Sequence, residues 1–201
     1  MMKKVIGITG GIASGKSNVC NVIKNEGYQI IDSDKINRDL SLKDEPIYLK
    51  IVEKFGTEYL TSDGEIDKKK LAKLIFHDSK AKEELNNISH PIIINEIKRQ
   101  IDLATDDIIF VEIPLLYEAH LEYLCDKVIC VFLNKKTQVE RLMQREGIDE
   151  DYALEKIHSQ SVATGGGGAG TIMVVYKATK GKKWTITSNY AGLIVSQVLI
   201  W

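Results

Sequence analysis

Short runs of apolar residues, rich in β-branched side chains, recur along the chain with few polar interruptions. The four runs that we expect to form strands span Lys4–Thr9, Tyr28–Ile31, Ile108–Ile113 and Val128–Leu133. Runs in which polar and apolar residues do not alternate are typical of parallel strands that are covered on both faces. Because segments with helical periodicity separate the runs, the sequence predicts an α/β fold built on a parallel sheet.

The segments between the runs carry signals for helices. Apolar residues recur at helical spacing over Ser17–Glu26, and Gly27 follows as a natural stop. Three more helices are expected between the second and third runs: they open at Pro46, span Lys68–Phe76 and begin at Ser89-His90-Pro91, with Ser89 as N-cap. A crossover connection needs only about a dozen residues plus its loops. The insert is far longer, so it predicts a helical subdomain beside the sheet.

After the last run, Thr137 and Glu140 stand at the spacing of a capping box, which predicts a helix that starts at Thr137. Arg141 and Arg145 are four residues apart on this helix and therefore share one face. They are candidates for neutralising charge on a phosphoryl group in transfer, and the alternative is that they are ordinary arginines on a solvated face.

Composition and charge agree with a soluble globular protein. Apolar residues make up 44% and charged residues 27%, and the formal net charge is −1. This balance favours neither nucleic acid nor a membrane as partner, and no run of apolar residues is long enough to predict a transmembrane helix. Cys20, Cys125 and Cys130 form no CxxC pair, which favours reduced thiols and a cytoplasmic location.

A glycine-rich stretch follows the first run directly. Residues 10–17, GGIASGKS, satisfy G-x-x-x-x-G-K-[ST] between an expected strand and an expected helix. Glycines let backbone N–H groups surround phosphate oxygens, and the positive end of the next helix faces the same anion. Lys16 adds a mobile charge for the outer phosphates, and the Ser17 hydroxyl is a candidate ligand of Mg²⁺. The residues expected to hold the phosphates of a nucleotide are Gly11, Ile12, Ala13, Ser14, Gly15, Lys16 and Ser17.

Carboxylates follow two of the expected strands. Asp32 and Asp34 come at the end of the second run, where open parallel sheets hold their ligands. An aspartate there can accept the proton of an acceptor hydroxyl; Asp32 could instead hold Mg²⁺ through water, and either aspartate could cap the next helix. Glu112 ends the third run in the manner of a Walker B element, although aspartate is more usual at that position.

One nucleotide-binding class is disfavoured by a single residue. Asn134-Lys135-Lys136-Thr137 follows the fourth run and is similar to the guanine-reading N-K-x-D motif. Threonine stands where that motif needs aspartate, so a GTPase is disfavoured.

Five ordered stretches resemble the dephospho-CoA kinase family across about residues 1–160. They are GITGGIASGKS (7–17), IIDSDKINRDL (30–40), SHPII (89–93), VEIPLLYE (111–118) and QVERLMQREG (138–147). The resemblance implies a three-layer P-loop kinase with a helical substrate-binding insertion and a lid. It also implies the reaction: phosphorylation by ATP, with Mg²⁺, of the ribose 3′-hydroxyl of dephospho-CoA, which is the last step of CoA synthesis.

The resemblance further implies domains and roles. Residues 1–39 and 105–134 match the nucleotide-binding core, 40–104 the acceptor-substrate domain and 135–160 the lid. Asp34 matches the proposed catalytic base, and it is expected to act with Lys16, Arg141 and Arg145. The residues expected at the acceptor are Thr9, Asp34, His90, Pro114, Leu115 and Leu116, and those expected at the metal are Ser17, Asp32 and Glu112.

The end of the chain departs from the family pattern. Residues 161–201 hold no acidic residue, four lysines and seven of the chain's 15 glycines. Gly165–Gly170 satisfies G-x-G-x-x-G, but it follows an expected helix rather than a strand, so a flexible linker is the better interpretation than a second nucleotide site. Thr171–Tyr176 is a candidate fifth strand. The tail is therefore expected either to complete the core or to be disordered.

The sequence thus predicts a monomeric kinase with ATP and dephospho-CoA as substrates. Two alternatives stay open at this stage. One is a P-loop kinase for another small acceptor, such as a nucleoside or nucleotide. The other is a nucleotide-binding module that the altered tail has inactivated, because the family's corresponding segment helps to frame the adenine.

Overall fold

The computed structural model describes residues 3–159 and 171–175. It divides into two compact units, one with the residues up to Ile31 and from Thr105 onward, the other with Asp32–Ala104. The helical insert predicted from the sequence therefore forms a unit of its own. This unit begins at Asp32, whereas the acceptor-substrate domain implied by the resemblance begins at residue 40.

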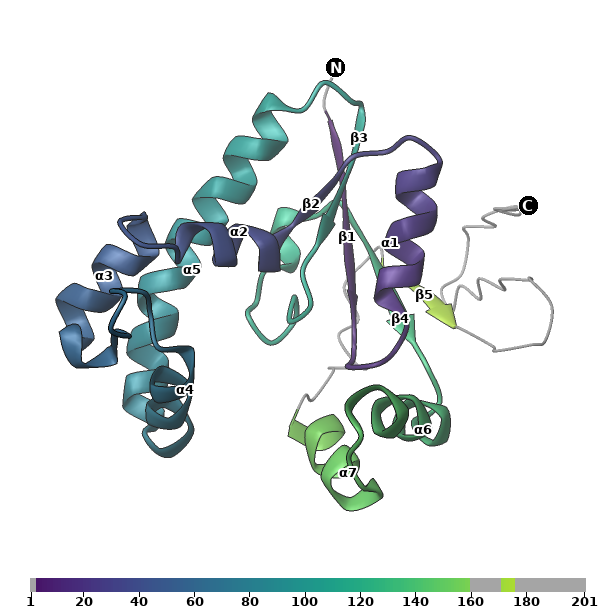
Figure 1. The fold of residues 1–201 in the computed structure, drawn as a ribbon. Helices are drawn as coiled ribbons and strands as arrows, with labels where there is room; N and C mark the ends of the chain where they lie inside the picture. The colour runs from purple at the N-terminus through teal and green to yellow at the C-terminus, as the bar shows by residue number, and fades with distance from the viewer. Residues whose placement is uncertain (1–2, 160–170, 176–201) are drawn as a thin grey trace. The chain divides into compact units, whose positions relative to one another are not determined.

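A parallel sheet lies at the centre of the first unit (Figure 1). Its middle strand, β1 (Lys4–Gly10), pairs in parallel with β3 (Ile108–Glu112) and with β4 (Lys127–Phe132). The strand order is β2-β3-β1-β4-β5, with β2 (Ile30–Asp32) and β5 (Thr171–Val175) at the two ends. The four predicted strands are confirmed, and the candidate fifth strand is confirmed as β5, which pairs in parallel with β4.

The register of the sheet aligns the carboxyl ends of neighbouring strands. Ile8 of β1 lies opposite Glu112 of β3, and Gly10 of β1 lies opposite Val131 of β4. The loops that leave these strands therefore start at the same edge of the sheet, which is where open α/β sheets bind their ligands.

Helices of the first unit follow β1 and β4. Helix α1 (Lys16–Asn25) packs against β1 (Figure 1) and closes over a buried cluster that includes Ile8 and Cys20. The short 3₁₀ helix η2 (Glu122–Leu124) precedes β4, and α6 (Lys135–Glu146) and α7 (Glu150–Ser159) follow it. The helices α6 and α7 pack against each other around the buried side chains Val139, Leu142 and Ala153.

The predicted start of α6 is wrong. The helix begins at Lys135, because the Asn134 side chain caps it by accepting the Thr137 N–H at 3.0 Å. The Thr137 hydroxyl also donates to this Asn134 oxygen at 3.0 Å, so it does not cap a helix of its own. Asparagine caps at least as well as threonine. Since it comes first after β4, the helix starts there.

The second unit is entirely helical. Its elements are α2 (Ser33–Leu40), α3 (Pro46–Phe55), the 3₁₀ helix η1 (Thr57–Tyr59), α4 (Lys68–His77) and α5 (Ser79–Leu103). The long helix α5 packs against α2, α3 and α4.

The prediction that a helix begins at Ser89 is also wrong. Helix α5 begins at Ser79, after the capping side chain of Asp78, and continues through Pro91. The Ser89 hydroxyl donates to the carbonyl of Leu85 at 2.9 Å, one turn back along the same helix. Proline removes one backbone hydrogen bond from a helix interior. Packing against three other helices stabilises α5 in spite of that loss.

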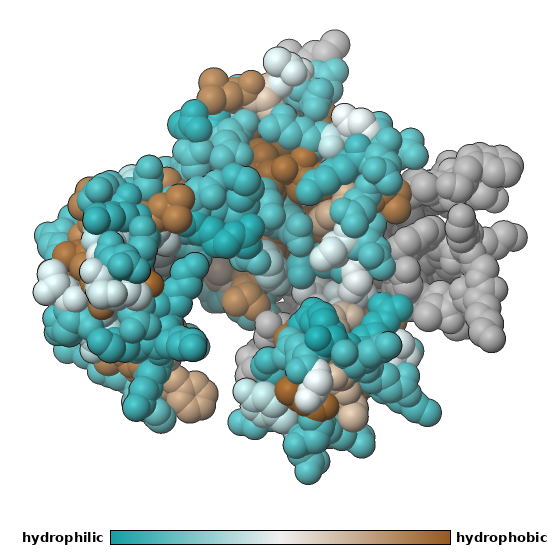
Figure 2. Space-filling view, in the orientation of Figure 1, coloured by the Kyte–Doolittle hydropathy of each residue, from teal (hydrophilic) through white to brown (hydrophobic). Residues whose placement is uncertain are grey.

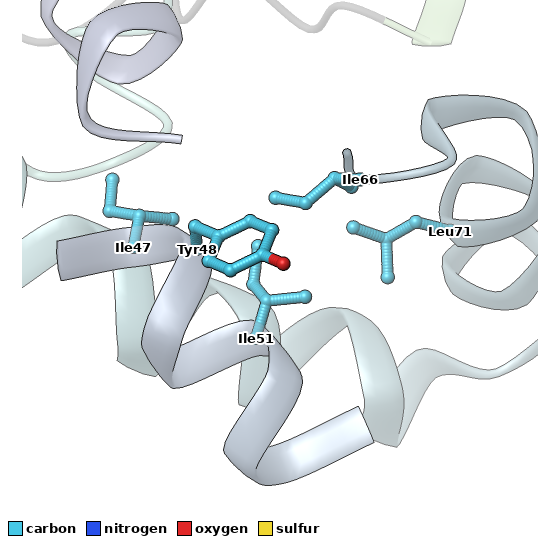
Figure 3. Packing of buried hydrophobic residues seen from close by; sticks show 5 residues of the cluster. All are labelled: Ile47, Tyr48, Ile51, Ile66 and Leu71. Atoms are coloured by element: carbon cyan, nitrogen blue, oxygen red, sulfur yellow. The ribbon is translucent and has the colours of Figure 1, made fainter. Parts of the chain in front are cut away.

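An apolar core holds the helical unit together (Figure 3). Tyr48 and Ile51 of α3 lie toward Ile66 and Leu71, Ile47 of the same helix belongs to the same cluster, and all five residues are buried. Hydrophilic side chains cover most of the face that Figure 2 displays, as expected when apolar side chains gather inside. Of the helices in residues 3–159, none is both long and apolar enough to span a bilayer.

We expect the replacement of Ile51 by alanine to lower the free energy of unfolding by about 2–5 kcal/mol, because it removes buried methyl groups and leaves a cavity. The side chain is only 3% exposed. Leu49 lies on the same helix but is 53% exposed, so Leu49→Ala should cost less than about 0.5 kcal/mol. Urea denaturation followed by far-UV circular dichroism measures both losses of stability. Equal losses would contradict the burial of Ile51 in the core of the helical unit.

Candidate functional site

The backbone between β1 and α1 forms the floor of the candidate site. It turns tightly over residues 11–14, where the Ser14 N–H donates to the Gly11 carbonyl at 3.1 Å. The φ angles are positive at Gly10 (154°), Ala13 (56°) and Gly15 (97°). A Cβ on Gly10 would lie 2.4 Å from the carbonyl oxygen of Val131. Only glycine fits at that position, because β4 approaches the turn so closely.

The start of α1 offers its amides to an anion. Gly15 is the N-cap residue and supplies no side-chain acceptor to the first turn. The first N–H groups of a helix have no partner within the helix, and together with the helix dipole they favour a negative ligand. This end of α1 is therefore suited to phosphate.

A cavity of about 340 Å³ opens above this backbone. Its lining consists of residues of the turn, the start of α1 and two arginines of α6: Gly11, Ala13, Ser14, Gly15, Lys16, Ser17, Asn18, Arg141 and Arg145. Three of the lining side chains are cationic, and none of the described lining residues is acidic. The volume falls within the range of small-molecule sites. The cavity is thus suited to a polyanion.

The structure brings the predicted arginines to the turn between β1 and α1. A Cβ on Gly15 would lie 3.4 Å from Nη1 of Arg141, so this guanidinium lies directly beside the turn. Arg145 is 54% exposed at its side chain and pairs with Glu146 at 2.7 Å. Lys16 extends back along the turn, where its Nζ donates to the Gly10 carbonyl at 3.4 Å. This weak bond leaves Lys16 close to the place of a ligand.

The Ser14 hydroxyl is buried without a hydrogen-bond partner among the described residues. Ser14 is 2% exposed as a residue, and it is among the residues that line the cavity. A buried hydroxyl that makes no hydrogen bond costs about 1–3 kcal/mol. The Ser14 hydroxyl therefore has a hydrogen-bond donor that no described residue uses.

Two of the three predicted metal residues lie near the start of α1. Ser17 lines the cavity, and Cys20, three residues further on the same helix face, donates through Sγ to Oε2 of Glu112 at 3.2 Å. Burial, and then the negative charge of Glu112, raise the pKa of Cys20 to about 12, so the thiol keeps its proton and acts as donor. Glu112 is held beside α1 in this way.

Asp32 and Asp34, the carboxylates that follow the second predicted strand, belong to the helical unit. The Asp32 side chain accepts the N–H of Lys35 at 2.9 Å and caps α2, so the capping alternative is confirmed for this residue. Asp34 lies in the first turn of α2. In residues 3–159 and 171–175, no group of three His, Cys, Asp or Glu side chains gathers to hold a metal ion by itself.

The predicted acceptor residues occupy different surroundings. Thr9 is buried, and its hydroxyl donates to the carbonyl of Pro114 at 3.0 Å, which fixes the loop after β3 against β1. Leu115 is 45% exposed, whereas Leu116 is fully buried in the core. His90 lies in the middle of α5 and not at its first turn. Their contact with an acceptor stays a prediction.

Two features of the site were missed at the level of sequence. Asn18 lines the cavity, and its position directly after the fixed serine of the motif could have indicated this. Gln138 of α6 donates through Nε2 to the carbonyl of Ile12 at 2.5 Å. Its helical spacing from Arg141 and Arg145 places it on their side of α6. Its hydrogen-bond partner Ile12 is 126 positions away, so the sequence around Gln138 does not indicate the bond.

Curated relatives carry one name. The chain is 46% identical over 161 residues to the dephospho-CoA kinase of Enterococcus faecalis, which covers 79% of this chain and 81% of that protein. It is 42% identical over 159 residues to the dephospho-CoA kinase of Carboxydothermus hydrogenoformans, covering 78% of this chain and 77% of that protein.

Solved structures share the fold. The dephospho-CoA kinase from Campylobacter jejuni superposes with a TM-score of 0.62 at 28% identity, covering 88% of this chain and 90% of that chain. TT1252 from Thermus thermophilus has the same fold, with a TM-score of 0.77 at 24% identity, covering 89% and 91%. The family model for dephospho-CoA kinase matches residues 4–165. The chain therefore belongs to the dephospho-CoA kinase family.

Proposed function

We propose that this chain transfers the γ-phosphoryl group of ATP to the ribose 3′-hydroxyl of dephospho-CoA and so produces CoA. The observation that carries the proposal is the cationic cavity over the β1–α1 turn in a member of this family. Phosphoryl transfer needs positioning and charge neutralisation more than covalent chemistry from the protein. The amides, one lysine and two arginines that line this cavity supply both.

The phosphates of ATP are held by the turn in this proposal. Backbone N–H groups of residues 11–17 and the Lys16 ammonium bind the outer phosphates. Arg141 and Arg145 neutralise the charge that spreads over the phosphoryl oxygens during transfer. The Ser14 hydroxyl, which has no partner in the described residues, donates to a phosphate oxygen.

Mg²⁺ would be held mainly by the nucleotide itself. The ion usually keeps several waters and takes one or two protein ligands beside substrate phosphates. This fits a cavity that has a hydroxyl ligand and, within residues 3–159 and 171–175, no carboxylate cluster of its own. We assign Ser17 as its direct ligand and Asp32 and Glu112 as partners of its waters. Bound there, Mg²⁺ would neutralise charge on the β- and γ-phosphates.

Asp34 takes the role of general base. Its carboxylate accepts the proton of the 3′-hydroxyl while the new bond from oxygen to phosphorus forms. The bond between the γ-phosphorus and the bridging oxygen breaks at the same time, and ADP leaves. Thr9, His90, Pro114, Leu115 and Leu116 are assigned to acceptor binding, Leu116 through packing behind the site.

The domain roles follow the same proposal. Residues 40–104 bind the acceptor, and 135–160, which contain α6 and α7, close over the nucleotide as a lid. The enzyme acts as a monomer in the cytoplasm, with neither nucleic acid nor membrane as partner. The formal net charge of −1 supports only the last two points, because it gives no general attraction to polyanions.

A panel of acceptors tests the proposed reaction. With labelled ATP and Mg²⁺, we expect label to pass rapidly to dephospho-CoA and only slowly to nucleosides, nucleoside monophosphates and CoA itself, which lacks a free 3′-hydroxyl. Chromatography of the products measures the transfer. Faster labelling of a nucleoside would show that dephospho-CoA is not the preferred acceptor. ATP binding without any transfer would indicate an inactive nucleotide-binding module.

The variant Asp34→Asn tests the general base. We expect turnover to fall at least about a hundredfold, because the amide cannot accept the proton, while ATP affinity stays the same. Asp39→Asn is the matched control, since Asp39 lies on the same helix and pairs with Lys35 at the surface. Steady-state rates and calorimetric ATP binding report the two quantities. Unchanged turnover in Asp34→Asn would remove this residue from the mechanism.

Ser14→Ala tests the buried hydroxyl. Because the substitution deletes a polar atom without a partner among the described residues, the nucleotide-free protein should be as stable as before or more stable by up to about 1–3 kcal/mol. ATP should bind several-fold more weakly, so it should raise the melting temperature less. Ser89→Ala, which deletes a hydroxyl that already bonds to Leu85, should leave ATP affinity unchanged. Full ATP affinity in Ser14→Ala would contradict the assigned contact.

A further inference from the structure

A hydrogen bond joins α6 to the middle of the phosphate-binding turn. Nε2 of Gln138 donates to the carbonyl oxygen of Ile12 at 2.5 Å, in partly buried surroundings. The two residues are 126 positions apart in the chain, so the bond connects two elements that the sheet brings together. Gln138 is absent from the described residues that line the cavity, whereas Ala13, which follows Ile12, is among them.

The accepting carbonyl belongs to the one peptide unit of the turn that can flip. Residues 11–14 form a four-residue turn closed by the Ser14 N–H and the Gly11 carbonyl. In such turns the central peptide takes one of two opposite orientations, and a positive φ at the third residue marks the flipped one. Here the third residue is Ala13, with φ at 56°. Positive φ is unfavourable for any residue that has a Cβ. The flipped orientation of the Ile12–Ala13 peptide therefore needs support from outside the turn.

The orientation of this peptide decides where one amide points. In a planar trans peptide the carbonyl and the following N–H point in opposite directions, and no described peptide bond is cis. Since the Ile12 carbonyl points to Gln138 on α6, the Ala13 N–H points away from that side chain. With the opposite orientation, the Ile12 oxygen would take the place of that N–H and would repel a phosphate.

We propose that Gln138 is a positioning residue that keeps the Ala13 N–H available to a phosphate of ATP. It contacts no reacting atom and acts through the Ile12–Ala13 peptide. The inference rests on the proposed function only in that the bound anion is a nucleotide phosphate.

Apolar packing keeps the two elements together independently of this hydrogen bond. Ile12 and Ala13 pack against the cluster of Val139, Leu142 and Ala153. Removal of the Gln138 amide should therefore leave α6 in place beside the turn and affect chiefly the orientation of the peptide.

The test compares ATP binding by two variants in the absence of acceptor. Gln138→Leu removes the donor but keeps a side chain of similar size, and we expect it to raise the Kd for ATP at least tenfold in calorimetry. Gln144→Leu is the matched control on the exposed part of the same helix and should leave the Kd unchanged. Unchanged affinity in Gln138→Leu would overturn the proposal.

A second background separates positioning from a general structural role. Glycine adopts positive φ without strain, so in an Ala13→Gly background the turn should keep its orientation without the glutamine. There, we expect Gln138→Leu to weaken ATP binding by less than threefold. If Gln138 merely stabilised α6, the loss would be the same in both backgrounds, and that result would overturn the inference. Because these assays contain no acceptor, failure to phosphorylate dephospho-CoA would count against the proposed function alone.

Discussion

The constraint on which the site depends is the path of the backbone from β1 into α1. The chain has to leave a central strand, pass within contact of β4 and enter a helix with its first amides unsatisfied. Positive φ angles at Gly10, Ala13 and Gly15 make this path possible. The space beside Gly10 is closed by the Val131 carbonyl, so the turn cannot relax toward the sheet. A rigid sheet thus holds a strained turn in a shape that suits an anion.

Local patterns made much of this arrangement predictable. The strands are apolar because the sheet is covered, and the turn is rich in glycine because its path requires it, so both leave a direct mark in the sequence. Helix starts were less predictable. Ser89 and Thr137 both have good capping chemistry, yet α5 begins at Ser79 and α6 at Lys135. Several candidate caps compete in each case, and an earlier cap that suits the packing takes precedence.

Some residues of the candidate site could be predicted from local sequence patterns and others could not. Lys16 and Ser17 could be predicted because a fixed spacing identifies them. The bond from Cys20 to Glu112 and the bond from Gln138 to Ile12 join residues that are 92 and 126 positions apart, and no local pattern indicates such partners. Family resemblance also does not tell a contact residue from a supporting one. Leu116 is fully buried, so its motif position reflects packing as much as any contact with an acceptor.

Helix α6 contributes side chains to the cavity and to the turn between β1 and α1. Gln138, Arg141 and Arg145 follow one another at helical spacing, so one helix carries both the side chain that bonds to the turn and the two cations that line the cavity. A displacement of α6 would change all three contacts together. The cavity gathers three cationic side chains and includes Ser14, whose hydroxyl has no hydrogen-bond partner among the described residues. In the proposed function, a polyphosphate would neutralise the three cations and accept a hydrogen bond from this hydroxyl. If the proposal holds, the contacts that bind the nucleotide are the same contacts that depend on the position of α6, so tight binding and correct placement of the arginines would go together.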